Sequence, residues 1–153
     1  MLAAFSFAAC ESDSVTFKYD APEEWIEFTD YDYPDVDKIE IYYLREEDTA
    51  NLNFILNNNT DGGDIDQSLD ALVDFIESLG GNEIVSSEVY EIAGEEGFKI
   101  VYNYVDEVQP FKYAQYGFVH GGKNYVFTYT AVPEEFDKYF EEVEAVIDTS
   151  RFE

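Results

Sequence analysis

Basic residues are scarce in this sequence: 8 Lys and Arg stand against 35 Asp and Glu, and the formal net charge is −27 at pH 7. With so few cations to neutralise phosphates, DNA and RNA are excluded as partners. The same charge opposes electrostatic docking to an anionic bilayer. A single His and a single Cys cannot supply the usual ligands of a zinc site, and a lone Cys cannot form an internal disulfide.

The apolar stretch 1–9 (MLAAFSFAA) is too short to cross a bilayer, which takes about 20 residues. It is typical of the end of a secretory signal peptide, with small residues at the cleavage site. Residues 7–10 (FAAC) resemble the bacterial lipobox, in which the Cys is lipidated and becomes the mature N-terminus, although Phe7 stands where Leu is usual. No Lys or Arg precedes the stretch, so we expect the precursor to start upstream of Met1. The alternative is that Cys10 is an ordinary buried thiol in a first strand.

Aromatic residues are abundant, with 13 Tyr and 13 Phe, and apolar residues make up 46% of the chain. This composition is the opposite of that of a disordered chain, despite the charge. A length of 153 residues fits one domain with a core that needs no disulfide or metal. We therefore expect a signal-peptide remnant (1–9), a lipidated Cys10 with a short polar tether (10–14) and a single domain (15–153). The localisation that follows is secretion across the cytoplasmic membrane and a lipid anchor on its outer face.

Short segments of alternating apolar and polar residues predict antiparallel strands with one packed side. In 51–57 (NLNFILN) the even-numbered residues are apolar and point one way, whereas the Asn residues point mostly the other way. The clearest hairpin turns at 120–123 (HGGK), and a second pair of strands is separated by 93–96 (AGEE). The predicted strands are 15–19, 25–28, 38–44, 51–57, 83–92, 97–105, 111–119 and 124–131.

Apolar residues at helical spacing predict two helices, 65–79 and 133–148. Asp64 is a good N-cap for the first helix and the glycines at 80 and 81 end it, while Pro133 suits the first position of the second. We expect Phe152 to lie in a short tail. The order of strands, helix, strands, helix predicts an α+β fold: a central antiparallel β-sheet of about six or more strands with helices packed on it as an α/β/α sandwich. The predicted core includes Trp25, Leu72, Ile76, Phe127, Phe136 and Phe140.

Several local patterns, in this order along 15–153, resemble the PsbP-like superfamily. That group includes the PsbP subunit of photosystem II, the Ran-binding Mog-type proteins and small bacterial lipoproteins. The patterns are F-x-Y-x-x-P-x-x-W from Phe17 to Trp25, the helix 65–79, Ile92-Ala93-Gly94, the strand 98–104, the segment 122–131 (GKNYVFTYTA), and Phe136, Tyr139, Ile147 and Phe152. The resemblance implies a central antiparallel sheet sandwiched by helices and a role in partner binding, and it brings no catalytic residue.

Two loops carry oxygen ligands that could hold a divalent cation. Asn57, Asn59 and Asp61 precede Gly62 with the spacing of the first half of an EF-hand loop. The twelfth position of that loop is Ser68 instead of a bidentate Glu, and the segment before it reads as a strand. The second loop carries Asp30, Asp32, Asp35 and Asp37. Calcium is the one cofactor considered, and the alternative for both loops is solvated charge.

Catalytic chemistry finds little support in the sequence. His120 lies beside two glycines in a turn, an exposed place for a base that must be held oriented. A carboxylate-based hydrolase would need two carboxylates about 5–9 Å apart in a cleft, one of them with a raised pKa. The sequence supplies many carboxylates but does not place such a pair.

Tyrosines cluster on the three predicted central strands, where core packing accounts for most of them. Tyr also serves binding surfaces, because its ring packs while its hydroxyl stays wet. If one face of the sheet is left open, these tyrosines would line a binding site. The residues in question are Tyr102, Tyr104, Tyr113, Tyr116, Tyr125 and Tyr129.

The function favoured at this point is a non-enzymatic, lipid-anchored binding or accessory protein of the bacterial cell envelope. Its partner would be an envelope protein or a small ligand, and its contact with the membrane would be through the lipid anchor alone. One alternative is a carboxylate-based hydrolase of the cell envelope. A second is a calcium-responsive module.

Overall fold

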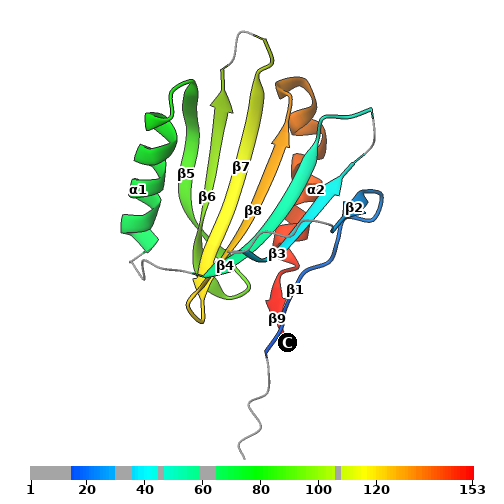
Figure 1. Ribbon diagram of the computed structural model, residues 1–153, viewed down its shortest axis with the longest axis vertical. Helices are drawn as coiled ribbons and strands as arrows, with labels where there is room; N and C mark the ends of the chain where they lie inside the picture. The colour runs from blue at the N-terminus through cyan, green and yellow to red at the C-terminus, as the bar shows by residue number, and fades with distance from the viewer. Residues whose placement is uncertain (1–14, 30–35, 45–46, 59–64, 106–107) are drawn as a thin grey trace, which may run out of the picture.

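The computed structural model describes residues 15–29, 36–44, 47–58, 65–105 and 108–153 (Figure 1). This part of the chain forms two helices, a seven-stranded antiparallel sheet and a two-stranded sheet, which confirms the α+β fold. In chain order the elements are β1 (Phe17–Lys18), β2 (Ile26–Phe28), β3 (Val36–Tyr43), β4 (Asn51–Asn58), α1 (Ile65–Ser78), β5 (Asn82–Ile92), β6 (Glu95–Tyr104), β7 (Phe111–His120), β8 (Lys123–Ala131), α2 (Pro133–Asp148) and β9 (Arg151–Phe152).

The large sheet has the strand order β2-β3-β4-β8-β7-β6-β5, and every neighbouring pair is antiparallel. Its two tightest hairpins turn through residues with positive φ, as two-residue turns between strands require. Gly121 and Gly122 form the predicted turn between β7 and β8. Between β5 and β6 the turn is Ala93 and Gly94 alone, so Glu95 and Glu96, expected in the loop, belong to β6.

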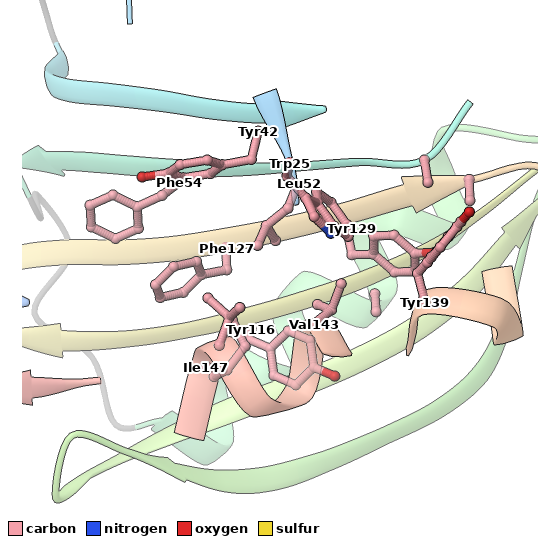
Figure 2. Close-up of a cluster of buried hydrophobic side chains, with 14 of the residues drawn as sticks. Trp25, Tyr42, Leu52, Phe54, Tyr116, Phe127, Tyr129, Tyr139, Val143 and Ile147 are labelled. Carbon is pink, nitrogen blue, oxygen red and sulfur yellow. The ribbon is translucent and has the colours of Figure 1, made fainter. Parts of the chain in front are cut away.

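One face of the sheet packs against α2 and holds the main core (Figure 2). The even-numbered residues of β4 and the odd-numbered residues of β8 supply its large side chains, among them Phe54 and Phe127. From α2, Phe136, Val143 and Ile147 belong to the same core. The helix is also fastened by polar contacts, because Trp25 Nε1 donates to Glu142 Oε1 at 3.0 Å and Lys99 pairs with Glu144 at 2.5 Å.

The opposite face is covered by α1 only over the strands β5 and β6, at one edge of the sheet (Figure 1). Leu69 and Ile76 of the helix bury Ile100 of β6 there. The side chains packed around this small cluster are Leu72, Val73, Ile84, Phe98 and Tyr102. The two helices therefore lie on opposite faces and at different positions along the sheet.

The C-terminal segment is a strand, which corrects the expectation that Phe152 lies in a tail. Phe152 pairs with Phe17 in the β1–β9 sheet, and its ring stacks on His120 at 4.0 Å between ring centroids. Two-residue strands carry no periodicity, so the alternation rule could not find β9. The pairing brings both ends of the domain together at one end of the molecule (Figure 1).

Most of the predicted core is confirmed, since Trp25, Ile76, Phe127 and Phe136 are buried. The prediction was wrong for Leu72 and Phe140, which are half-buried. Both lie at the margins of their helix faces and pack against the core from the side. The described helices contain no span long and apolar enough to cross a membrane.

Candidate functional site

On the face of the sheet opposite α2, neither of the two described helices covers the strands β2, β3, β4, β8 and β7, and we call this region the open face. None of its described side chains is charged, in a chain with a net charge of −27. The residues that the register places on it are Ile26, Phe28, Val36, Ile39, Ile41, Tyr43, Asn51, Asn53, Ile55, Asn57, Phe111, Tyr113, Gln115, Gly117, Val119, Asn124, Val126, Thr128 and Thr130. A neutral surface in so acidic a chain needs a physical cause, because solvated faces normally take the charged residues.

At the end of the sheet where β4 begins and β8 ends, the open face carries a group of neutral polar side chains, which we call the polar block. Cross-strand pairing places Asn51 beside Thr130, and Asn53 beside Thr128, which in turn lies beside Gln115. These five residues define the block. They occupy two adjacent rows on three strands, an area of about 10 Å by 7 Å from the usual strand and residue spacings.

The polar block has hydrogen-bonding capacity that the described part of the protein leaves largely unused. Gln115 Nε2 lies 3.4 Å from Thr128 Oγ1, and Asn51 Nδ2 lies 3.4 Å from the carbonyl oxygen of Thr49, so both bonds are long. The side chains of Asn53 and Thr130 make no hydrogen bond to any described residue. Amide and hydroxyl groups both donate and accept, so the block can bind groups of either kind.

Aromatic rings flank the polar block on two sides. Tyr113 lies next to Thr130 and stacks on Tyr102, with ring centroids 4.9 Å apart and planes 10° from parallel. On the other side, Tyr43 lies next to Asn51 and meets Phe28 edge-on at 5.1 Å. Phe28 is 48% exposed, which is high for so large an apolar side chain.

The hydroxyls of the stacked pair are held in their neutral form. Burial raises the pKa of Tyr102 to about 12, and the neighbouring Tyr113 adds to the shift. Burial and the nearby Tyr104 likewise raise the pKa of Tyr113. These two hydroxyls therefore stay protonated across the physiological pH range and remain available as donors.

The six tyrosines of the predicted binding set divide between the two faces of the sheet. Tyr116, Tyr125 and Tyr129 lie in the core under α2. Tyr102, Tyr104 and Tyr113 point to the other face and are half-buried. A role in binding is therefore a proposal for the second group only.

The predicted metal ligands lie mostly outside the described residues. Of the proposed ligands in the two loops, only Asn57 and Asp37 belong to the described residues. Asn57 lies on the open face beside Asn124. The oxygen Oδ1 of Asn57 is buried and has no described hydrogen-bond partner. No group of three or more His, Cys, Asp or Glu side chains in the described ranges is placed to hold a metal ion. Calcium binding by Asn57, Asn59, Asp61, Asp30, Asp32 and Asp35 stays a prediction, and Cys10 also lies outside these ranges.

Carboxylates border two hollows on either side of the C-terminal end of α2, with volumes of about 470 and 460 Å³. Glu91 and Asp148 line the first, and Asp20, Glu23, Glu24 and Glu142 line the second. Glu40 lines neither hollow, although burial raises its pKa against the opposing hydrogen bond from Tyr42. Among the described carboxyl groups, the one with a raised pKa, Glu40, thus lies apart from both hollows, whereas a glycoside hydrolase needs such a group in its cleft.

His120 is more firmly held than its position beside two glycines indicated. Its Nδ1 lies 2.7 Å from Glu95 Oε1, and its ring stacks on Phe152. His120 is the last residue of β7, and it packs there against Phe152 of β9. Its side chain is 39% exposed. These contacts with Glu95 and Phe152 give His120 a structural role.

The residues that sequence reasoning missed are those of the polar block. Asn51 and Asn53 were noted only as the outward side of a strand, and Thr128, Thr130 and Gln115 were not considered. One signal was present, because the outward positions of 51–57 and 124–131 hold Asn and Thr where Asp or Glu would be expected. Only the strand order shows that these positions lie side by side.

No protein-family model and no curated protein matches the sequence. Solved structures do match in fold. LpqN of Mycobacterium tuberculosis, described as involved in cell envelope biogenesis, has a TM-score of 0.68 and 14% identity over 94% of this chain and 87% of its own. The cyanobacterial PsbP of Synechocystis sp. PCC 6803 has a TM-score of 0.62 and 17% identity over 97% of this chain and 98% of its own.

The Ran-binding protein Mog1p of Saccharomyces cerevisiae has a TM-score of 0.61 and 12% identity over 88% of this chain and 89% of its own. Identities this low establish the fold alone. The chain therefore has the PsbP/Mog-like fold that its sequence patterns resemble.

Proposed function

We propose that this protein is a non-enzymatic, lipid-anchored accessory protein of the bacterial cell envelope, and that it binds its partner on the open face. The observation that carries the proposal is the neutrality of that face in a chain with 35 acidic residues. Solvation alone would favour charged side chains there. A neutral surface with unused hydrogen-bonding groups and flanking aromatic rings is what a binding surface requires.

The anchor would hold the polar block at the end of the molecule that points away from the membrane. The first described residue, Val15, enters at the end of the molecule where β1 pairs with β9 (Figure 1). The five residues 10–14 can span at most about 18 Å even when fully extended. Thr128 and Thr130 lie at the other end of β8 from the turn that packs on β9, so a partner would meet the polar block on the side away from the membrane.

The chemistry of the open face supports binding over catalysis. General acid–base catalysis needs a titratable group with a pKa near the working pH. The described residues of the face offer only tyrosines, and the pKa values of Tyr102 and Tyr113 are raised. Glu40, whose pKa is also raised, lies on the α2 side of the sheet, away from the polar block.

The described roles of two structural neighbours are of the same kind as the one proposed here. LpqN is described as acting in cell envelope biogenesis, and Mog1p as binding the protein Ran. They support an envelope location and a role in partner binding, respectively. Neither supplies the identity of the partner for this chain.

A site-specific crosslink in intact cells tests the proposal. A benzoylphenylalanine would replace Thr128 at the centre of the polar block or, as the control, Asp74 on the exposed side of α1. We expect a covalent adduct from position 128 that is absent from position 74, whether the partner is a protein or a glycan. Asn53→Asp in the same chain should abolish the adduct, because it places a charge on the neutral face. Equal adducts from both positions, or none from position 128, would overturn the proposal.

A further inference from the structure

The charge of the protein restricts what the open face can bind. A ligand with ionised groups would lose water on this face and find no opposite charge there. Anionic polymers are also repelled by the net charge of −27. A cationic ligand would be drawn instead to the acidic surface elsewhere. A neutral ligand is the one class for which the face is matched.

The hydrogen-bonding groups of the polar block match a ligand rich in hydroxyls. Each of its amide and hydroxyl side chains can donate and accept, as a sugar hydroxyl does. Asn53 and Thr130 have this capacity free within the described structure. Beside the block, the buried Oδ1 of Asn57 is a further acceptor without a described partner.

The apolar surroundings of the block match the other half of a sugar ring. A pyranose presents an apolar C–H surface and a rim of hydroxyls, so it can pack on aromatic rings while its rim forms hydrogen bonds. The stacked pair of Tyr102 and Tyr113 borders the block on one side, and the pair of Tyr43 and Phe28 borders it on the other. A sugar chain that runs across the strands would meet an aromatic pair, the polar block and the second aromatic pair in turn.

Across the strands, the order of polar and aromatic side chains differs from that of a usual protein interface. Protein interfaces usually have an apolar, aromatic centre and a polar rim. Across the strands the order is reversed here, because the polar block lies between the two aromatic pairs, whereas the next row along the strands is apolar (Ile39, Ile55 and Val126). Building on the function proposed above, we propose that the open face binds a neutral, polyhydroxylated glycan chain.

Titration of the full chain with neutral hexasaccharides tests this proposal. The probes are chitohexaose, cellohexaose and maltohexaose, and the control is the glucosamine hexamer, which is chitohexaose without its acetyl groups and carries positive charge. Binding is followed by NMR through the side-chain amide signals of Asn53 and Gln115. We expect at least one neutral probe to shift these signals with an affinity that stays unchanged when the salt concentration rises. The cationic control should bind elsewhere and lose affinity with salt.

Two variants locate the site. Thr128→Val removes a hydroxyl at nearly constant shape, and we expect it to weaken binding of the neutral probe about tenfold or less, the usual effect of one hydrogen bond. The matched control is Asn103→Ala, an Asn on the α2 side of β6, which should leave binding unchanged. Thermal melting of each variant verifies that it is folded.

The outcomes separate this proposal from the one on which it rests. If no neutral probe binds, or if binding is unaffected by Thr128→Val, the glycan assignment is wrong. If an adduct still forms from position 128 in cells, the open face remains a binding surface and its partner is of another class, such as a protein. If no neutral probe binds and no adduct forms from position 128, both proposals are wrong.

Discussion

Tyr102 and Tyr113 stack across β6 and β7 with ring centroids 4.9 Å apart and planes 10° from parallel. Tyr102 also packs against the cluster under α1, so the pair joins the helix-covered part of this sheet face to the open part. One stack therefore serves both the stability of the α1 layer and the shape of the proposed binding surface.

We expect Tyr113→Leu to lower the free energy of unfolding by about 0.5–1.5 kcal/mol, the usual contribution of an aromatic pair beyond its buried area. Tyr113→Phe keeps the ring and should cost less. Urea unfolding of the two variants measures the difference. Equal losses for both would show that the hydroxyl, and not the stack, makes the contribution.

The core under α2 gives a prediction with a matched control. Phe136 is 1% exposed and faces Tyr129 at 4.8 Å between ring centroids, whereas Phe75 of α1 is 58% exposed. Phe136→Ala should lower the free energy of unfolding by about 3–5 kcal/mol, as truncation of a buried aromatic does. Phe75→Ala should change it by less than about 0.5 kcal/mol, as surface substitutions do. Similar losses from both variants in equilibrium unfolding would contradict the assignment of the core.

The raised pKa of Glu40 predicts how the free energy of unfolding depends on pH. Burial raises its pKa above the ordinary value, so in the interval between the two values the folded state holds a proton that the unfolded state has released. Stability should therefore increase as pH falls from 7 through the raised pKa of Glu40. Glu40→Gln removes the titrating group and should reduce the gain in Tm between pH 7 and pH 5.

Glu153 is the control for this measurement, because its pKa is shifted the other way. Hydrogen bonds from Lys18 and Arg151 lower the pKa of Glu153 to about 2. Its stabilising effect is present above the ordinary pKa and is lost only as pH falls toward about 2. Glu153→Gln should thus leave the change in Tm between pH 7 and pH 5 as it is in the unaltered protein. A gain that Glu40→Gln fails to reduce would refute the role of Glu40.

The anchor predicts where the protein is found in the cell. A diacyl modification of Cys10 supplies two chains, which is enough for stable retention at a membrane where one chain is marginal. With its complete signal sequence, the protein should fractionate with membranes, and Cys10→Ala should release it to the soluble fraction. Mass spectrometry of the unaltered protein should show the lipid, and a soluble, unmodified Cys10 would disprove the anchor.

The sequence predicted most of the fold because strand alternation and helical spacing are local. The segment 51–57 showed that one strand has an apolar and a neutral polar side, and β4 has those two sides. The sequence could not show that β8 lies between β4 and β7, since that order depends on contacts between distant segments. For the same reason it could not show that α1 stops short of β7 and leaves the polar block uncovered.

The tyrosines illustrate the same limit at the level of single residues. Tyr113 and Tyr116 lie in one strand an odd number of positions apart, so alternation alone places them on opposite faces. That parity was available in the sequence, but which face would be covered by α2 was not. As a result, Tyr116 is fully buried, whereas Tyr113 lies on the open face.

The accessibility of Thr128→Cys to a thiol reagent in intact cells tests the central claim most directly, because it needs no knowledge of the partner. If Cys10 is lipidated as proposed, it has no free thiol, and the printed sequence holds no other Cys, so the introduced thiol is then the target within this sequence. Asp74→Cys on the exposed side of α1 is the control. We predict that the ratio of labelling rates at 128 and 74 is several-fold lower in cells than in the purified protein. An identical ratio in cells and in solution would show that nothing covers the open face and would contradict the account.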